Sequence, residues 1–214
     1  SPRTAKRKPV QGSAAAGGQL QDPTRYTPHF SWRNGSLWCE GSNLESVAAR
    51  TGTPAYVYSA ASIGGAYREF DGALGSLPHT PCYSVKANSN LSILRLLAGL
   101  GSGFDIVSGG ELYRLQRAGV AASRVVFSGV GKSREEIREA LRAGIRLFNV
   151  ESEAELDLLA AAASRLGRRA PAAVRVNPDI VAGGHRHIST GRHQHKFGVD
   201  WGGARRLYLA QQYL

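Results

Sequence analysis

Methionine is missing from all 214 residues, and only two cysteines, Cys39 and Cys82, are present. Two cysteines in a chain of this length do not make a disulfide framework, so a cytoplasmic location is expected. There is also no run of about 18 apolar residues, so neither a membrane-spanning helix nor a membrane partner is expected. Because even position 1 is not methionine, we expect a processed chain or a piece of a longer one.

Acidic residues are scarce: 16 Asp and Glu stand against 27 Lys and Arg, which gives a net charge of +11. Such a balance is typical of nucleic-acid-binding proteins, but no basic stripe interleaved with aromatic residues and no known nucleic-acid motif accompanies it. The arginines Arg134, Arg138 and Arg142 instead suit the solvated face of a helix. No nucleic-acid partner is therefore expected.

Three regions follow one another along the chain. Residues 1–28 are rich in Ser, Pro, Ala, Gly, Lys and Arg without periodicity, which predicts a flexible basic tail. Residues 29–58 form an N-terminal β segment, with a hairpin at Asn34-Gly35 and a strand over 55–58. Residues 59–214 alternate between short apolar runs and helical patterns.

This alternation predicts a parallel α/β fold. Strands are expected over 80–86, 104–108, 124–127, 147–150 and 172–176, and the first four lead into helical patterns. An open doubly wound sheet and a closed eight-stranded barrel both fit the pattern. A barrel would be incomplete here, with about five of its eight strands.

Polar residues stand where these strands end. Lys86 ends the first strand, where such folds place active sites, and a partly desolvated lysine there can act as a nucleophile toward a carbonyl. A solvated lysine in a turn is the alternative. Further polar residues at or just after the strand ends are expected to share one edge with Lys86: Asn88, Asp105, Ser108, Ser128, Asn149, Glu151, Arg175 and Asn177. Helix capping is the other role open to Ser and Asn there.

Two further sequence patterns give weaker evidence for a functional site. The glycines of the turn 128–133 lack the spacing of a phosphate-binding loop, which leaves a glycine turn followed by a helix over 134–143 that Ser133 and Glu136 are expected to cap as a capping box. Four histidines lie within residues 185–195, and imidazole suits zinc. No cysteine or carboxylate lies among them, so no metal site is expected.

Several segments together resemble the diaminopimelate decarboxylase family. They are Tyr83–Asn88, Phe104–Leu112, Arg175–Asp179, and Ile188–Gly191 with Lys196–Gly198, in that family's order and approximate spacing. The resemblance extends from about Thr53 to Val199. Its last element favours this family over the related ornithine and arginine decarboxylases.

The resemblance implies an alanine-racemase-like (β/α) barrel with a second β domain, and pyridoxal 5′-phosphate as cofactor. Lys86 matches the lysine that binds the cofactor covalently, and Asp105 and Arg175 match polar residues that line its pocket. His185, Ser189 and Thr190 match a loop over the active site, where they would meet the substrate.

The implied reaction is decarboxylation of meso-diaminopimelate to L-lysine, by an enzyme that is a homodimer when full length. The family's glycine-rich phosphate clamp and the glutamate that pairs with the ring nitrogen have no counterpart in the 214 residues. The isolated chain is therefore expected to bind cofactor weakly, to aggregate and to be inactive. The alternatives are a decarboxylase of another basic amino acid or polyamine precursor, and a non-catalytic homologue.

Overall fold

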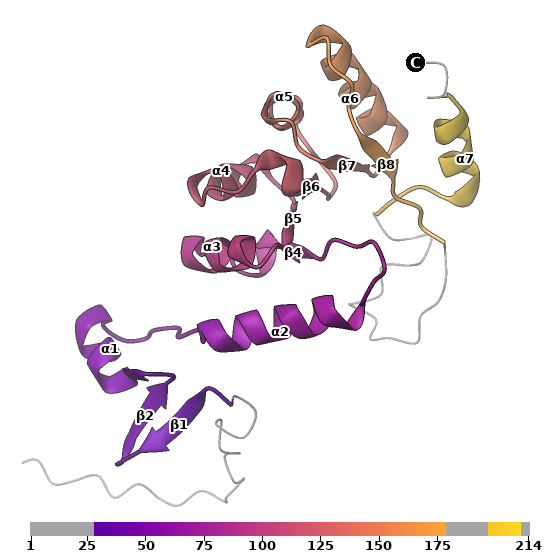
Figure 1. Cartoon of the computed structure of the whole chain (residues 1–214). Coiled ribbons are helices and arrows are strands. Elements are labelled where there is room, and N and C mark those ends of the chain that lie inside the picture. The colour runs from indigo at the N-terminus through magenta and orange to yellow at the C-terminus, as the bar shows by residue number, and fades with distance from the viewer. Residues whose placement is uncertain (1–27, 179–196, 211–214) are drawn as a thin grey trace, which may run out of the picture. The chain divides into compact units, whose positions relative to one another are not determined.

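The computed structural model describes residues 28–178 and 197–210 (Figure 1). The contacts within it divide the chain into two units, residues 1–62 and 63–214. The boundary predicted after residue 58 stays a prediction, and the basic tail over 1–27 lies outside the described residues.

The first unit contains a small antiparallel sheet. Its strands are β1 (Phe30–Arg33), β2 (Ser36–Cys39) and β3 (Ser42–Asn43), in that order. Asn34 and Gly35 join β1 to β2 with φ values of 49° and 81°, as the tight turn of a hairpin requires. The predicted hairpin is therefore confirmed. The helix α1 (Leu44–Thr51) follows, and the Asn43 side chain caps it by accepting a hydrogen bond from the Ser46 N–H.

The strand predicted over residues 55–58 is wrong. This segment is extended but pairs with no strand in the described part of the chain. Its aromatic side chains face solvent, with Tyr56 91% and Tyr58 55% exposed. Aromatic and β-branched residues favour a strand only where neighbouring strands supply hydrogen bonds and packing, and composition alone does not show whether a neighbour exists.

The second unit is built on a five-stranded parallel sheet in the order β4-β5-β6-β7-β8, which confirms the predicted parallel α/β fold. The strands are β4 (Cys82–Ser84), β5 (Gly103–Ile106), β6 (Val125–Phe127), β7 (Leu147–Val150) and β8 (Ala172–Val174). The helices are α2 (Ala60–Ala73), α3 (Leu91–Gly99), α4 (Gly109–Arg117), α5 (Arg134–Ala143), α6 (Glu153–Arg165) and α7 (Trp201–Ala210). Two short 3₁₀ turns complete the set, η2 (Val85–Ala87) and η3 (Ala122–Arg124).

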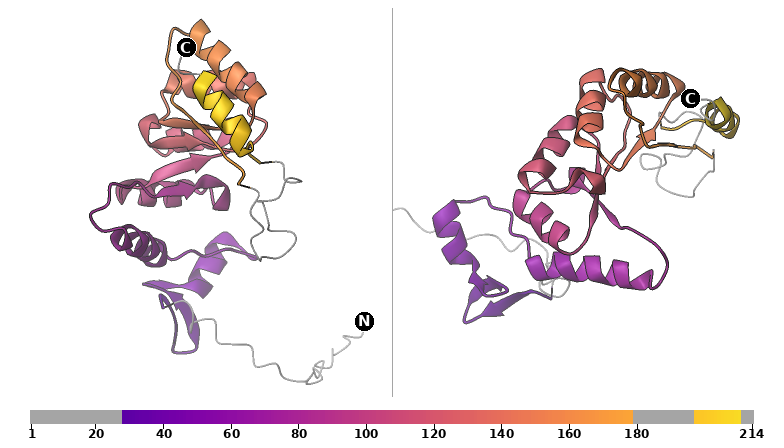
Figure 2. Two further views of the ribbon diagram at one scale, coloured as in Figure 1. Left: turned by 90° about the vertical axis from the view of Figure 1, so that its right-hand side faces the viewer. Right: turned by 45° about the horizontal axis from the view of Figure 1, so that its top comes forward.

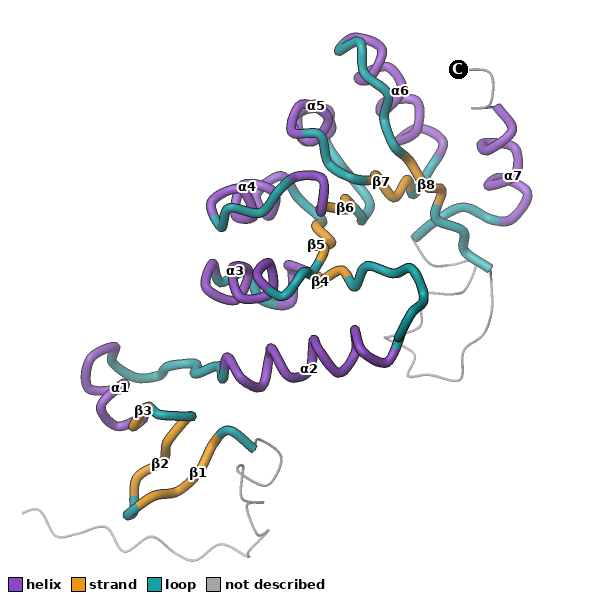
Figure 3. The backbone as a smooth tube through the Cα atoms, in the orientation of Figure 1, coloured by secondary structure: helices purple, strands orange, loops and turns teal. Residues whose placement is uncertain are grey.

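The two faces of this sheet differ. Helices α3 to α6 lie along one side of the curved row of strands (Figures 2 and 3). Strand residues that point to this side, among them Phe104, Phe127 and Phe148, are buried against the helices. Because side chains alternate along a strand, residues such as Asp105 and Asn149 point to the opposite side, which we call the open face.

The helix α5 shows how sequence and packing agree locally. Ser133 and Glu136 form the predicted capping box, each accepting a backbone N–H of the other. Glu136 also accepts the Gly109 N–H at 2.8 Å, which fixes the start of α4 beside α5. These backbone donors, that of Gly109 first, hold the pKa of Glu136 below its usual value.

After residues 179–196 the chain returns to the last strand of the sheet. Val199 forms a parallel bridge with Val176, just beyond β8. The Asn177 N–H donates to the Val199 carbonyl at 2.7 Å, and the Val199 N–H donates to the Arg175 carbonyl at 2.9 Å. The sheet is thus extended by the beginning of a sixth parallel position.

Candidate functional site

The five parallel strands end at one edge of the sheet, the carboxyl edge, where we expected functional residues. Lys86 lies there but not on β4: the strand ends at Ser84, and Lys86 stands in the 3₁₀ turn η2. Val85 anchors this turn because its side chain is fully buried. Lys86 itself is exposed, and its amine has no hydrogen bond or ion pair within the described ranges.

Three side chains form a connected row along the carboxyl edge, the polar row of Asp105, Ser128 and Asn149. The Asn149 amide donates to the Ser128 hydroxyl oxygen at 2.9 Å, and the Ser128 hydroxyl donates to the Asp105 carboxylate. They come from β7, from the residue after β6 and from β5, so the row crosses three neighbouring strands. The row ends at the Asp105 carboxylate, which accepts the hydrogen bond from the Ser128 hydroxyl.

The polar row leads toward the strand that precedes Lys86. Asp105 is the register partner of Ser84 at the end of β4. The Ser84 hydroxyl is buried and is the one such side-chain atom without a hydrogen-bond partner in the part of the chain that the structure describes. Burial raises the pKa of the Cys82 thiol, and the charge of Asp105 raises it further.

Arg175 is held by a buried carboxylate. The side chain of Glu151 is 2% exposed and accepts three hydrogen bonds. The donors are the Arg175 guanidinium at 3.0 Å, the Gly129 N–H at 3.1 Å and the Gly198 N–H at 3.0 Å. Glu151 therefore joins the end of β8, the turn after β6 and the returning segment at 197–199.

Gly198 is required for that close approach. A Cβ atom at this position would lie 2.8 Å from the Arg175 carbonyl oxygen, and its φ of 77° disfavours any other residue. Lys86 and Arg175 follow the two outermost strands, β4 and β8, which a flat sheet would separate by about 19 Å, four spacings of about 4.8 Å. The row of strands is curved (Figure 3), so its two ends lie closer together than in a flat sheet.

Not every predicted residue joins this arrangement. Ser108 caps α4 by accepting the Glu111 N–H, and Asn88 accepts the Asn90 N–H in the turn before α3. Ser108 thus takes the capping role that was the alternative for such residues, while Asn88 stabilises the turn that leads to the N-cap of α3, Asn90. His185, Ser189 and Thr190 lie outside the described residues, as do all four clustered histidines. Among the residues that are described, no group of three His, Cys, Asp or Glu side chains is placed to hold a metal ion.

Lys132 was not predicted to have a structural or functional role, because its segment was interpreted only as a glycine turn. Its side chain is 1% exposed and pairs with Glu155 at 2.6 Å. No local pattern could have revealed this, because the partner lies 23 positions further along the chain.

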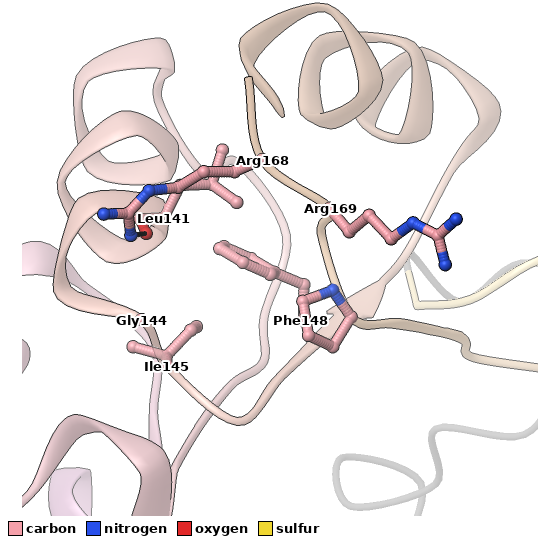
Figure 4. A pocket seen from close by; sticks show the side chains of 7 residues that line it. Leu141, Gly144, Ile145, Phe148, Arg168 and Arg169 are labelled. Atoms are coloured by element: carbon pink, nitrogen blue, oxygen red, sulfur yellow. Dashed lines mark hydrogen bonds between the residues drawn. The ribbon is translucent and has the colours of Figure 1, made fainter. Parts of the chain in front are cut away.

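A cavity of about 350 Å³ lies at the other edge of the sheet, where β7 and β8 begin (Figure 4). It is lined by Ile145, Phe148 and Arg168, among others. The Arg168 guanidinium donates to the Leu141 and Arg142 carbonyls at the end of α5, so it is engaged in capping that helix. Parallel α/β folds keep their chemistry at the carboxyl edge, so we assign this cavity no part in the site.

Within the described ranges, no helix is both long and apolar enough to cross a bilayer. Residues 60–213 match the sequence family described as pyridoxal-dependent decarboxylase, pyridoxal binding domain. The diaminopimelate decarboxylase of Pseudomonas fluorescens is 52% identical over 181 residues, which are 84% of this chain and 44% of that protein. The chain thus spans less than half the length of the curated relative.

Solved structures agree with these sequence matches. The diaminopimelate decarboxylase of Helicobacter pylori, complexed with L-lysine, superposes with a TM-score of 0.76 at 44% identity, over 79% of this chain and 43% of that one. A lysine/ornithine decarboxylase from Vibrio vulnificus complexed with putrescine matches with a TM-score of 0.64 at 23% identity, over 79% and 41%, and shows the fold alone. Since the family match covers most of the described chain, this protein belongs to the pyridoxal-dependent decarboxylases and carries their pyridoxal-binding domain.

Proposed function

We propose that these residues supply the lysine-bearing part of a diaminopimelate decarboxylase, which converts meso-diaminopimelate to L-lysine. The observation that carries the proposal is the position of Lys86 at the carboxyl edge, beside a row of polar side chains on the open face. The higher identity to relatives named diaminopimelate decarboxylase supports this substrate over another basic amino acid or a polyamine precursor.

The residues at the carboxyl edge fit pyridoxal phosphate. Ser84 offers a buried hydroxyl without a partner in the described part of the chain, and Lys86 offers an exposed amine. Asp105 offers a carboxylate already oriented by Ser128, and Arg175 a guanidinium held by Glu151. We therefore assign covalent attachment to Lys86 and the polar walls of the pocket to Asp105 and Arg175.

When bound, pyridoxal phosphate takes up the electrons released as carbon dioxide leaves an amino acid. The chain itself contributes orientation and proton transfer. Lys86 holds the cofactor through its Nζ atom, and the same nitrogen carries a proton once the substrate has displaced it. Asp105 stays in place during these steps because Ser128 and Asn149 hold it.

The remaining assignments concern residues and partners beyond the described structure. We assign His185, Ser189 and Thr190 to a loop that contacts the substrate, as the resemblance implies. We also propose that the whole protein is a homodimer, acts in the cytoplasm and binds no nucleic acid or membrane. The two free cysteines, Cys39 and Cys82, suit a reducing compartment.

Borohydride reduction of a full-length protein that carries this segment, after addition of pyridoxal phosphate, tests the assignment of Lys86. The segment contributes five lysines that peptide mapping must distinguish. A pyridoxyl label on Lys86, lost in Lys86→Arg, supports the proposal. Equal labelling of the exposed Lys86 and of Lys6 or Lys8 would indicate only non-specific reaction with accessible amines and would overturn it.

A full-length protein that carries this segment tests the reaction. Release of carbon dioxide and L-lysine from meso-diaminopimelate, and not from L-lysine or L-ornithine, supports the proposed substrate. Turnover of L-ornithine or L-lysine instead would establish another decarboxylase. Labelling of Lys86 without any turnover would establish a non-catalytic homologue.

A further inference from the structure

The buried ammonium of Lys132 has every one of its donors engaged. Its N–H groups reach the Gly129 carbonyl at 2.7 Å, the Asn149 carbonyl at 2.8 Å and the Glu155 carboxylate at 2.6 Å. An ammonium has three donors, so none is left for a substrate or cofactor. The Nζ atom also lies 5.5 Å from the centre of the Phe127 ring, which points toward the helices. Lys132 therefore sits on the covered face and not among the reacting groups.

The two carbonyls that Lys132 binds belong to the supports of the polar row. Gly129 directly follows Ser128, and Asn149 is the residue whose amide donates to the Ser128 hydroxyl oxygen. One ammonium thus joins the turn after β6 to the end of β7. If these carbonyls move apart, the hydrogen bond from Asn149 to Ser128 is lost, and with it the orientation of Asp105.

The stability of the fold does not by itself require a charged side chain at position 132. Replacing both members of a buried ion pair by apolar residues of similar volume is often neutral or stabilising, whereas removing one member leaves an unpaired buried charge. The hydrogen bonds from Lys132 to the Gly129 and Asn149 carbonyls differ from the ion pair in this respect, because an apolar side chain has no donor to replace them.

We propose that Lys132 is a positioning residue that holds the turn after β6 and the end of β7 together and so orients Asp105 through Ser128 and Asn149. This inference rests on the proposed function, in which Asp105 lines the pocket beside Lys86. Lys132 acts through these residues and touches neither cofactor nor substrate.

The decisive variant is one in which both members of the Lys132–Glu155 pair are replaced, so that no unpaired charge stays buried. In a full-length protein that carries this segment, Lys132→Met alone strands the Glu155 carboxylate and should destabilise the fold. Lys132→Met combined with Glu155→Leu removes both charges and should regain stability. The exposed pair Arg138–Glu135, at 3.6 Å on α5, provides the matched control Arg138→Gln.

Three quantities are measured on each variant: the thermal unfolding midpoint, amide hydrogen exchange of residues 128–131 without cofactor, and the rate of borohydride-trapped labelling at Lys86. For the double variant we expect an unfolding midpoint above that of Lys132→Met, faster exchange, and labelling slower by about tenfold, the effect of losing one orienting hydrogen bond. Arg138→Gln should match the parent in all three.

A double variant that regains stability, exchange protection and labelling rate together would reduce Lys132 to a structural role and overturn the inference. If the double variant does not fold, Lys132→Arg decides, because it keeps the charge but cannot place three donors on the same atoms. Slower labelling at parental stability supports the inference, and the parental rate overturns it.

The Ser128→Ala background provides a second test. If Lys132 acts through Ser128, Lys132→Arg adds little to the loss that Ser128→Ala already causes; additive losses contradict the inference. Labelling of the parent at Lys86 tests the proposed function separately. A parent without label refutes that function, while the hydrogen-exchange comparison still reports on Lys132.

Discussion

Glu151→Gln is the substitution that most directly tests how the carboxyl edge is held. The carboxylate accepts hydrogen bonds on both oxygens: Oε1 from Arg175 and from the Gly129 N–H, and Oε2 from the Gly198 N–H. Glutamine has almost the same shape but only one acceptor oxygen. In its better orientation the amide oxygen keeps the first two partners, and the NH₂ group then faces the Gly198 N–H, donor against donor.

The expected cost follows from these contacts. Losing one hydrogen bond to a charged acceptor costs about 1.5–3 kcal/mol, because the side chain is 2% exposed and water does not easily replace the bond. The charge on Arg175 adds about 0–1 kcal/mol, since 42% of its side chain is exposed and solvent screens the pair. The free energy of unfolding should therefore fall by about 1.5–4 kcal/mol, a large share of the usual 5–15 kcal/mol.

Urea denaturation of a full-length protein that carries this segment measures the change. The midpoint should fall while the slope stays constant, as expected for a loss of stability without a change in exposed surface. Glu153→Gln is the matched control: it removes an exposed carboxylate from the first turn of α6 and should cost at most about 1 kcal/mol. If both variants lose the same small amount, the three hydrogen bonds of Glu151 do not hold the edge.

Three further outcomes are expected. Ser128→Ala should slow borohydride-trapped labelling of Lys86 by about tenfold, the effect of losing one orienting hydrogen bond, and Ser128→Thr should restore the rate; an unchanged rate would contradict the role of the polar row. Gly103→Ala should lower the free energy of unfolding in urea by about 1–3 kcal/mol, since its Cβ would lie 2.7 Å from the Cys82 sulfur; no loss would refute the overpacking. The lowered pKa of Glu136 means that its stabilising contribution is complete above its unfolded pKa of about 4.3 and is lost as pH falls through the lower folded value. Thermal midpoints of Glu136→Gln should therefore fall less than the parent's below about pH 4.3, and equal slopes would refute this.

Most of the second unit could be predicted because its signals are local. The capping box of Ser133 and Glu136 and the alternation in Phe104–Ile106 each lie within a few residues, and parallel connections follow once strands and helices alternate. The segment 55–58 has the same kind of composition as these strands, yet it forms none. Whether such a segment forms a strand depends on the presence of a neighbouring strand, and the local composition does not show this.

The candidate site could be predicted only in part, for the same reason. Asp105, Asn149 and Arg175 were found because residues at the ends of parallel strands share an edge whatever their partners are. Ser128 and Glu151 were placed at this edge too, but their hydrogen bonds were not predicted: Ser128 bonds a carboxylate 23 positions away, and Glu151 accepts from the backbone N–H of a residue 47 positions further along. Such pairs form only when the sheet order and the curvature bring the strands together.

Gly129 explains why the turn after β6 is the critical element of this edge. Its carbonyl accepts from Lys132 on the covered face, and its N–H donates to Glu151 on the open face. Its φ of 89° and the contact that a Cβ would make with Val107 at 3.3 Å leave glycine as the residue that fits. Two buried charges of opposite sign thus hold the backbone of one residue, one at its N–H and the other at its carbonyl. Because both act on the same residue, substitutions of Lys132 and Glu151 should have non-additive effects on the labelling of Lys86.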